Sequence, residues 1–316
     1  MSPEPKFPPL GRRAFLRRAG ALGGLGALAL GAPSLLAACG SSTSDDGAEG
    51  DTLTLSPDLG GRQLVGLFNY TGNYVEAGAP QRLALIIATP EGPPDPDGPD
   101  SLTVQLSRDG TDVGDPITLA RHADGVPIGY YPLEATFAEP GTWAVSTTLD
   151  DRPVAQSFLV EPPGESAILQ VGQQMVPVAT PTTADARGVN PICTRSPECP
   201  YHDLTLTEAL AAGTPVALMI STPQYCQTGV CGPVLDLVME QAAQVPGLTV
   251  VHAEVYVDPG AGGDPAAGGL TEAVDAYGLT FEPSLFVARA DGTVTARLDN
   301  IFDRTEIARA FQGAVA

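Results

Sequence analysis

Residues 215–233 read Pro-Val-Ala-Leu-Met-Ile-Ser-Thr-Pro-Gln-Tyr-Cys-Gln-Thr-Gly-Val-Cys-Gly-Pro, and the interpretation of the C-terminal part starts from this stretch. Its first seven residues form a nearly continuous apolar run, which is typical of a strand buried on both faces. Two cysteines, Cys226 and Cys231, follow in a short polar loop, and Gly232-Pro233 begins a segment with helical periodicity. The stretch therefore predicts a buried strand, a two-cysteine loop and a helix in succession.

The residues on either side of this stretch alternate between helical and strand patterns. Helices are predicted over residues 204–212, 233–244, 270–277 and 304–311, and strands over residues 215–221, 248–257, 284–289 and 293–298. Thr205 and Glu208 match a capping box, and Gly213 matches a helix stop. The order α-β-α-β-α-β-β-α places residues 200–316 in the α/β class.

Residues 52–160 have a different pattern of short apolar or alternating runs separated by Gly, Pro and Asp. Strands are predicted over residues 64–70, 82–88, 102–107, 117–120, 130–137, 143–149 and 155–160. About seven strands in a segment of about 110 residues predict an antiparallel β-sandwich of immunoglobulin-like type. Trp143 is expected to fill its core. Residues 161–199, rich in Pro and Thr, are interpreted as a linker or extended strap.

The N-terminus combines a basic start, an apolar middle and a small-residue end, which is typical of an export signal. Arg12-Arg13-Ala14-Phe15-Leu16 resembles the twin-arginine export motif, and Leu36-Ala37-Ala38-Cys39 resembles a bacterial lipoprotein box. The resemblance implies removal of residues 1–38 and attachment of lipid, such as palmitate, to Cys39. Residues 39–51 would then be a disordered tether. The alternative is an uncleaved membrane anchor.

These features predict a protein anchored by lipid on the extracytoplasmic face of the cell membrane. The chain has 16 Lys and Arg residues against 37 Asp and Glu residues, a formal net charge of -21. Such a surface repels nucleic acid and anionic lipid headgroups, so nucleic acid is excluded as a partner.

The element order and the two-cysteine loop resemble the thioredoxin-like family over roughly residues 200–314. Tyr225 precedes Cys226 as an aromatic residue precedes the first redox cysteine of that family, and Cys231-Gly232-Pro233 echoes its Cys-Gly-Pro-Cys motif. Pro283 stands where the family has a cis-proline that pairs with the substrate backbone. The resemblance implies a thiol–disulfide oxidoreductase acting on exported protein disulfides or thiols, with Tyr225 and Pro283 positioning the substrate.

Only a thiolate attacks a disulfide, and a helix N-terminus favours that anion. The spacing leaves the nucleophile open; we favour Cys226, with Cys231 as its resolving partner. Two departures from the family stand out. Four residues separate the cysteines instead of two, and the strand over residues 215–221 lacks a buried carboxylate. The alternative for this pair is a disulfide that only closes a loop.

Cys193 and Cys199 stand just before the α/β segment. Proximity in sequence favours the disulfides 193–199 and 226–231, although the other pairings stay open. The alternative is a copper or zinc site formed by Cys193, Cys199 and His202; otherwise no cofactor is expected. The two cysteine pairs are also candidates for electron exchange. His252, inside an apolar strand, is interpreted as a core histidine.

Three other functions stay open. The wide cysteine spacing fits non-enzymatic metal (copper) handling, and a catalytically silent domain fits a scaffold lipoprotein. A thiol peroxidase is the third, because Thr228 and Cys231 form the Thr-x-x-Cys pattern of peroxiredoxins. Against it, Pro223 is one residue out of step with that pattern.

Overall fold

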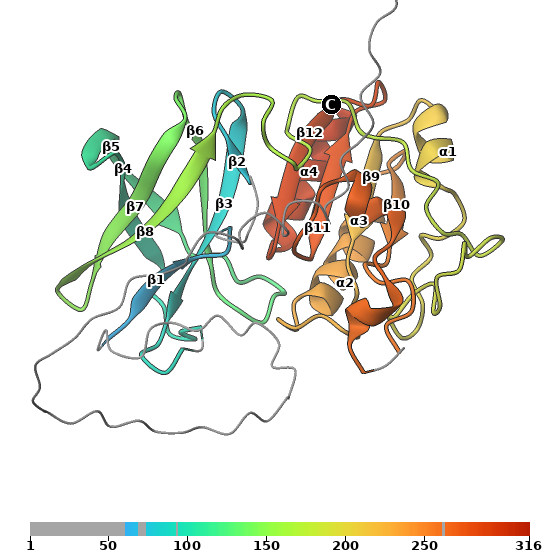
Figure 1. The fold of residues 1–316 in the computed structure, drawn as a ribbon, viewed down its shortest axis with the longest axis horizontal. Coiled ribbons are helices and arrows are strands. Elements are labelled where there is room, and N and C mark those ends of the chain that lie inside the picture. The colour runs from blue at the N-terminus through green and yellow to red at the C-terminus, as the bar shows by residue number, and fades with distance from the viewer. Residues whose placement is uncertain (1–60, 69–73, 93, 261–262) are drawn as a thin grey trace, which may run out of the picture. The chain divides into compact units, whose positions relative to one another are not determined.

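The computed structural model describes residues 61–68, 74–92, 94–260 and 263–316 (Figure 1). The predicted signal over residues 1–38, the lipidation site Cys39 and the tether over residues 39–51 lie outside the described residues. Within the described ranges, no helix has both the length and the apolar character needed to cross a bilayer.

Two sheets form the N-terminal β region, which we define as residues 61–161. The three-stranded sheet has the order β1-β3-β6, built from Gln63–Gly66, Pro80–Ala88 and Tyr131–Thr136. The five-stranded sheet has the order β2-β8-β7-β4-β5, built from Val75–Glu76, Arg152–Glu161, Gly141–Leu149, Ser101–Arg108 and Thr111–Ala120. All pairs are antiparallel except β2 with β8, which are parallel.

Aromatic side chains fill the space between these strands. The Phe137 ring packs edge-on against Trp143 and Phe158, with ring centroids 4.9 and 5.4 Å apart. Trp143 is buried as expected, and its Nε1–H donates to the carbonyl oxygen of Glu139 at 3.0 Å. The described residues are mostly β-sheet with few helices, which is consistent with the predicted immunoglobulin-like sandwich.

The sequence analysis predicted too short a range for strand β5 and did not predict strand β2. Strand β5 begins at Thr111, earlier than the predicted residue 117, because β4 and β5 form a hairpin around Asp109-Gly110. Both turn residues have positive φ, +48° and +81°, which suits a tight hairpin turn. The early part of β5 is exposed and carries no apolar periodicity. Strand β2 has two residues, too few for a pattern.

A third sheet lies in the C-terminal α/β region, which we define as residues 200–316. Its order is β10-β9-β11-β12, from Thr249–Ala253, Val216–Ile220, Ser284–Ala288 and Val294–Asp299. Strand β10 is parallel to β9, whereas β11 is antiparallel to both β9 and β12. The helices are α1 (Leu206–Ala211), α2 (Cys231–Ala242), α3 (Glu272–Ala276) and α4 (Arg304–Val315), and Pro265–Gly268 form a short 3₁₀ turn.

Alternate side chains of β9 face different helices, as the two-residue period of a strand requires. Ala217 and Met219 share a hydrophobic cluster with α2 and α4. Leu218 and Ile220 pack in the cluster that contains the buried residues of α1 and α3. Helices therefore cover both faces of this sheet, and every residue of β9 and β11 is buried.

Most predicted boundaries in this region lie within a few residues of those in the structure. The capping box is present: the Thr205 hydroxyl accepts from the backbone of Glu208, whose side chain accepts from the backbone of Thr205. Helix α2 starts at Cys231 rather than at Pro233, so the second cysteine belongs to the first helical turn. Strand β10 ends at Ala253, short of the predicted residue 257.

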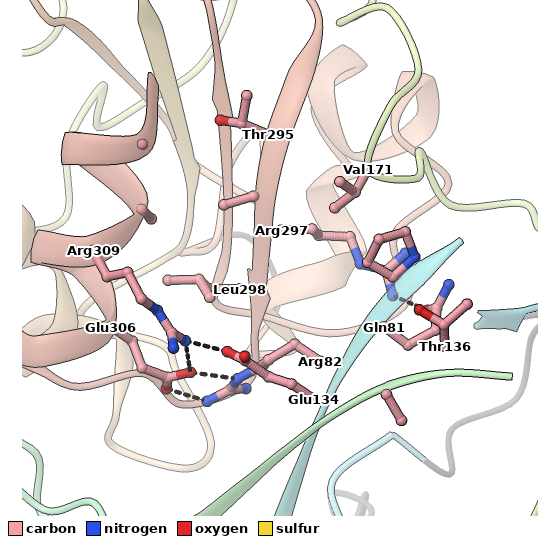
Figure 2. Close-up of a pocket in the computed structure, with 15 residues that line it drawn as sticks. Gln81, Arg82, Glu134, Thr136, Val171, Thr295, Arg297, Leu298, Glu306 and Arg309 are labelled. Carbon is pink, nitrogen blue, oxygen red and sulfur yellow. Dashed lines mark hydrogen bonds and ion pairs between the residues drawn. The ribbon is translucent and has the colours of Figure 1, made fainter. Parts of the chain in front are cut away.

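A buried ion pair joins the N-terminal β region to the C-terminal α/β region (Figure 2). Arg82 on β3 donates two hydrogen bonds to the carboxylate of Glu306 on α4, at 3.0 and 2.5 Å. The same guanidinium donates to the carbonyl oxygens of Asp299 and Ile301. Tyr130 donates its hydroxyl to Glu306 at 2.5 Å. The pair lines a pocket of about 590 Å³, and Figure 2 also shows the nearby exposed pair of Arg309 and Glu134.

Replacing Arg82 with Met should lower the free energy of unfolding by about 3–5 kcal/mol, because Glu306 would stay buried without its countercharge. Arg187→Met, which removes the exposed partner of Glu272, should cost no more than about 1 kcal/mol. The measurement is urea unfolding of the full chain. Equal losses in the two variants would contradict the assignment of Arg82–Glu306 as a buried, stability-determining pair.

Candidate functional site

The candidate residues meet at one edge of the C-terminal sheet. Strands β9 and β10 are parallel and in register, with Met219 opposite His252 and Ile220 opposite Ala253. Their carboxyl ends therefore lie together. The loop over residues 221–230 leaves this edge from β9, and Glu254 follows directly from β10.

Cys226 and Cys231 are joined by a disulfide bond. Cys226 is partly exposed in the loop, whereas Cys231 is fully buried as the first residue of α2. The backbone N–H of Cys231 donates to the sulfur of Cys226 at 3.3 Å. Gly229 closes the loop with φ of +67°, and its N–H donates to the Cys226 carbonyl oxygen at 3.1 Å. The sulfur of the partly exposed Cys226 thus lies at the N-terminus of a helix, a position that favours a thiolate once the disulfide is reduced.

The buried sulfur faces a carboxyl group that the sequence had not singled out. Glu282 Oε2 lies 3.4 Å from Cys231 Sγ and accepts a hydrogen bond from the backbone N–H of Thr222 at 2.5 Å. Burial raises the pKa of Glu282 to about 8. The signal for it was an acidic residue directly before Pro283 in an otherwise apolar stretch. The Glu282–Pro283 peptide bond is cis, at the proline for which the resemblance implies this geometry.

Two loop residues named in the sequence lie beside Cys226. Tyr225 is partly exposed, and its backbone N–H donates to the Thr222 carbonyl oxygen at 3.3 Å. The Thr228 hydroxyl lies 3.3 Å from the sulfur of Cys226. The peroxiredoxin-like pattern pairs Thr228 with Cys231, whereas the structure places its hydroxyl next to the other cysteine.

A second group of side chains lies beside this loop. Cys193, Cys199, His202 and His252 are all buried, and one ligand atom of each lies within 4.8 Å of the others. The expected disulfide between Cys193 and Cys199 is not formed: both are free thiols. A hydrogen bond from Cys199 lowers the pKa of Cys193. His252, interpreted from the sequence as a core histidine, is buried as expected but its ring faces these sulfurs.

Hydrogen bonds connect this group to the loop of the disulfide. The backbone N–H and the hydroxyl of Thr194 both donate to Glu254 Oε1, at 2.6 and 3.0 Å. The same hydroxyl accepts from the backbone N–H of Gln224 at 3.2 Å. The segment around Cys193 is therefore held to Glu254 by buried hydrogen bonds and to the segment before Cys226 by a partly buried one.

Two further groups of potential metal-ligand atoms occur among the described residues, and their side chains already bond to or pair with other protein groups. Glu282 with Cys226 and Cys231 forms one such group, and its two sulfurs are bonded to each other. His122, Asp303 and Glu306 form another. There His122 lies 3.1 Å from Asp303, and Glu306 is the partner of Arg82.

Comparison with known proteins yields little. No family model matches the chain, and no curated protein does. Among solved structures, a chimeric titin Z1Z2 functionalized with a KLER exogenous peptide from decorin matches with 18% identity over 29% of this chain and 84% of that one. The TM-score is 0.18, and the likeness supports no conclusion about fold or function.

The stability of the oxidised protein should depend on pH through Glu282. Between pH 4.5 and about 8 the folded protein keeps a proton on this carboxyl that the unfolded chain has lost. The free energy of unfolding should therefore fall as pH rises through this window, with a contribution of about 1.4 kcal/mol per pH unit. Glu282→Gln, which cannot titrate, should reduce the slope.

The measurement is urea unfolding of the oxidised full chain at a series of pH values across this window. Glu272→Gln, which replaces an exposed carboxylate on α3, is the matched control and should leave the slope as in the wild type. The same slope in the wild type and in Glu282→Gln would show that Glu282 does not carry the titration.

Proposed function

We propose that residues 200–316 form a thioredoxin-like domain that works as a thiol–disulfide oxidoreductase. The observation that carries the proposal is the asymmetry of the Cys226–Cys231 disulfide: the partly exposed Cys226 lies at a helix N-terminus, and the buried Cys231 faces Glu282. A loop-closing disulfide needs neither the accessible sulfur nor the carboxyl group.

The order of elements supports the fold. A buried strand, β9, leads directly into the two-cysteine loop and helix α2, and Pro283 precedes the β11–β12 hairpin beside them. Ser284, the residue after this proline, pairs with Ile220 at the end of β9. The proline therefore lies next to the start of the cysteine loop, where it can present backbone groups to an extended substrate.

In the reducing direction, the Cys226 thiolate attacks one sulfur of a substrate disulfide. A mixed disulfide forms, and the other substrate sulfur leaves as a thiolate. The Cys231 N–H, which donates to Cys226 Sγ, stabilises the attacking anion.

Cys231 then resolves the mixed disulfide. Glu282 gives its proton to Cys231 when the disulfide opens; the Cys231 thiol then transfers a proton back to the Glu282 carboxylate. The resulting thiolate attacks Cys226 Sγ, which releases the second substrate thiolate and forms the Cys226–Cys231 disulfide. Two electrons pass from the protein dithiol to the substrate. Glu282, with a pKa raised to about 8 by burial, is suited to exchange a proton with a thiol near neutral pH. The reverse sequence oxidises a substrate dithiol.

The proposed substrates are disulfides or thiols of exported proteins, because the N-terminal sequence resembles a twin-arginine signal and a lipoprotein box. Lipid on Cys39 would hold the enzyme at the extracytoplasmic face of the membrane, with the N-terminal β region between the anchor and the catalytic domain. That compartment favours disulfide chemistry.

Insulin reduction in the presence of dithiothreitol tests the chemistry. Cys226→Ser and Cys231→Ser should each abolish catalysis by the full chain, and only Cys231→Ser should accumulate a mixed disulfide, because Cys226 is then left unresolved. Gln227→Ala, an exposed change within the same loop, is the control and should keep wild-type activity. Wild-type turnover in either cysteine variant would refute the proposal, and trapping in Cys226→Ser would reverse the assigned roles.

Titration in glutathione buffers, read by mass spectrometry, tests the redox poise of the Cys226–Cys231 pair. An exchange enzyme should have a reduction potential between about −120 and −270 mV. A potential below about −300 mV is typical of structural disulfides and would identify the pair as a loop closure.

A further inference from the structure

We propose that Cys193, Cys199, His202 and His252 bind one Zn²⁺ ion in a closed, structural site next to the cysteine loop. This inference is independent of the oxidoreductase proposal, since it uses none of the residues assigned to exchange. It adds His252 to the three ligands that the sequence indicated.

Four of the six distances between the candidate ligand atoms are close to the edges of a zinc tetrahedron, and all four atoms lie within 4.8 Å of one another. Zn–N bonds of about 2.0–2.1 Å and Zn–S bonds of about 2.3 Å place two nitrogens about 3.3 Å apart and a nitrogen and a sulfur about 3.5 Å apart. In the structure, His252 Nδ1 lies 3.3 Å from His202 Nε2. Cys199 Sγ lies 3.3 Å from His202 Nε2 and 3.4 Å from His252 Nδ1. Cys193 Sγ lies 3.8 Å from His252 Nδ1.

The surroundings orient His252 as a ligand. Its Nε2 lies 3.1 Å from the backbone carbonyl oxygen of Ser221, which can only accept a hydrogen bond. Nε2 therefore carries the hydrogen, and the lone pair of Nδ1 points at the sulfurs. Outer hydrogen bonds of this kind fix the ring and tautomer of zinc-binding histidines. On the other side, the backbone N–H of Cys199 donates to Cys193 Sγ at 3.5 Å, a contact that stabilises a thiolate.

Burial and ligand chemistry favour a permanent zinc site over metal transport or catalysis. The four residues are between 0 and 5% exposed, so neither water nor a partner protein reaches the site. Two thiolates and two imidazoles complete a tetrahedral shell, which is the composition of structural zinc sites; catalytic zinc keeps one position open. The set of two sulfurs and two nitrogens also fits Zn²⁺ better than the softer all-sulfur preference of Cu(I).

The site would fasten two segments of the chain at one point. Cys193, Cys199 and His202 belong to the segment before α1, and His252 belongs to β10. Through Ser221 the ion is one hydrogen bond from the end of β9, where the cysteine loop begins. Zinc would thus hold the strap against the sheet and support the base of the loop.

The test uses the full chain purified without added metal. Elemental analysis should find one zinc per chain, and X-ray absorption at the zinc edge should show two sulfur and two nitrogen neighbours. Cobalt exchanged into the wild type should give the intense visible bands of a tetrahedral site and a thiolate-to-cobalt charge-transfer band. These readouts use the wild type, so they do not depend on whether a ligand variant folds.

Cys199→Ser and His252→Gln should each lose the bound zinc and the tetrahedral cobalt spectrum. The matched controls, Cys226→Ser and His122→Gln, should keep both, because their side chains lie outside the proposed shell. A Cys193–Cys199 disulfide in non-reducing peptide mapping, copper in place of zinc, or full zinc content in His252→Gln would each overturn the proposal. None of these outcomes bears on turnover by Cys226 and Cys231, so the two proposals can fail separately.

Discussion

The parallel pairing of β9 with β10 is the constraint on which the rest of the site depends. Both strands are fully or largely buried, and their register brings Ile220 and Ala253 side by side at one edge of the sheet. At that edge the backbone leaves the sheet, so some of its N–H and carbonyl groups no longer pair with a neighbouring strand and can bond to side chains. Ser221 orients His252, and Thr222 donates to Glu282, so the two cysteine groups are built on consecutive residues of one strand end. A shift of register between the strands would disassemble both groups.

The sequence predicted best what depends on neighbouring residues. The strand, the two-cysteine loop and the helix are contiguous, so their order and the proximity of Cys226 to Cys231 follow from spacing and periodicity. His252 and Glu282 could not be placed in the same way, because each reaches the site from another strand or the loop before one. An apolar strand containing a single histidine is also what a buried core looks like, and only tertiary structure shows which way the ring faces. The start of β5 was not predicted for a different reason. Its first residues are exposed and have no apolar periodicity, and they form a strand because they pair with β4 in a hairpin.

Glu282 resolves a difficulty that the sequence raised. The strand over residues 215–221 carries no acidic residue, which left no proton acceptor for a buried thiol. In the structure the carboxyl group comes instead from the residue before Pro283 and lies 3.4 Å from Cys231 Sγ. Its environment keeps it protonated at neutral pH, because burial penalises the carboxylate more than the Thr222 hydrogen bond favours it. In the proposed cycle, a neutral carboxyl beside the oxidised pair would donate a proton when the disulfide opens and would accept one when the thiol ionises again.

The pair Cys226–Cys231 includes the partly exposed Cys226, whereas Cys193 and Cys199 are both buried, and this difference favours different chemistry for the two pairs. Thiol exchange requires in-line approach of a substrate sulfur, so at least one sulfur must reach solvent, and Cys226 does. The sulfurs of Cys193 and Cys199 are buried and have two imidazole nitrogens directed at them, which no exchange reaction needs. A bound cation would neutralise thiolate charge in that buried position, where an unpaired anion is costly. Holding these thiols as zinc ligands would also prevent them from exchanging with Cys226 and Cys231 a short distance away. On this argument the proposed zinc would both fasten the strap and keep the proposed redox pair chemically separate.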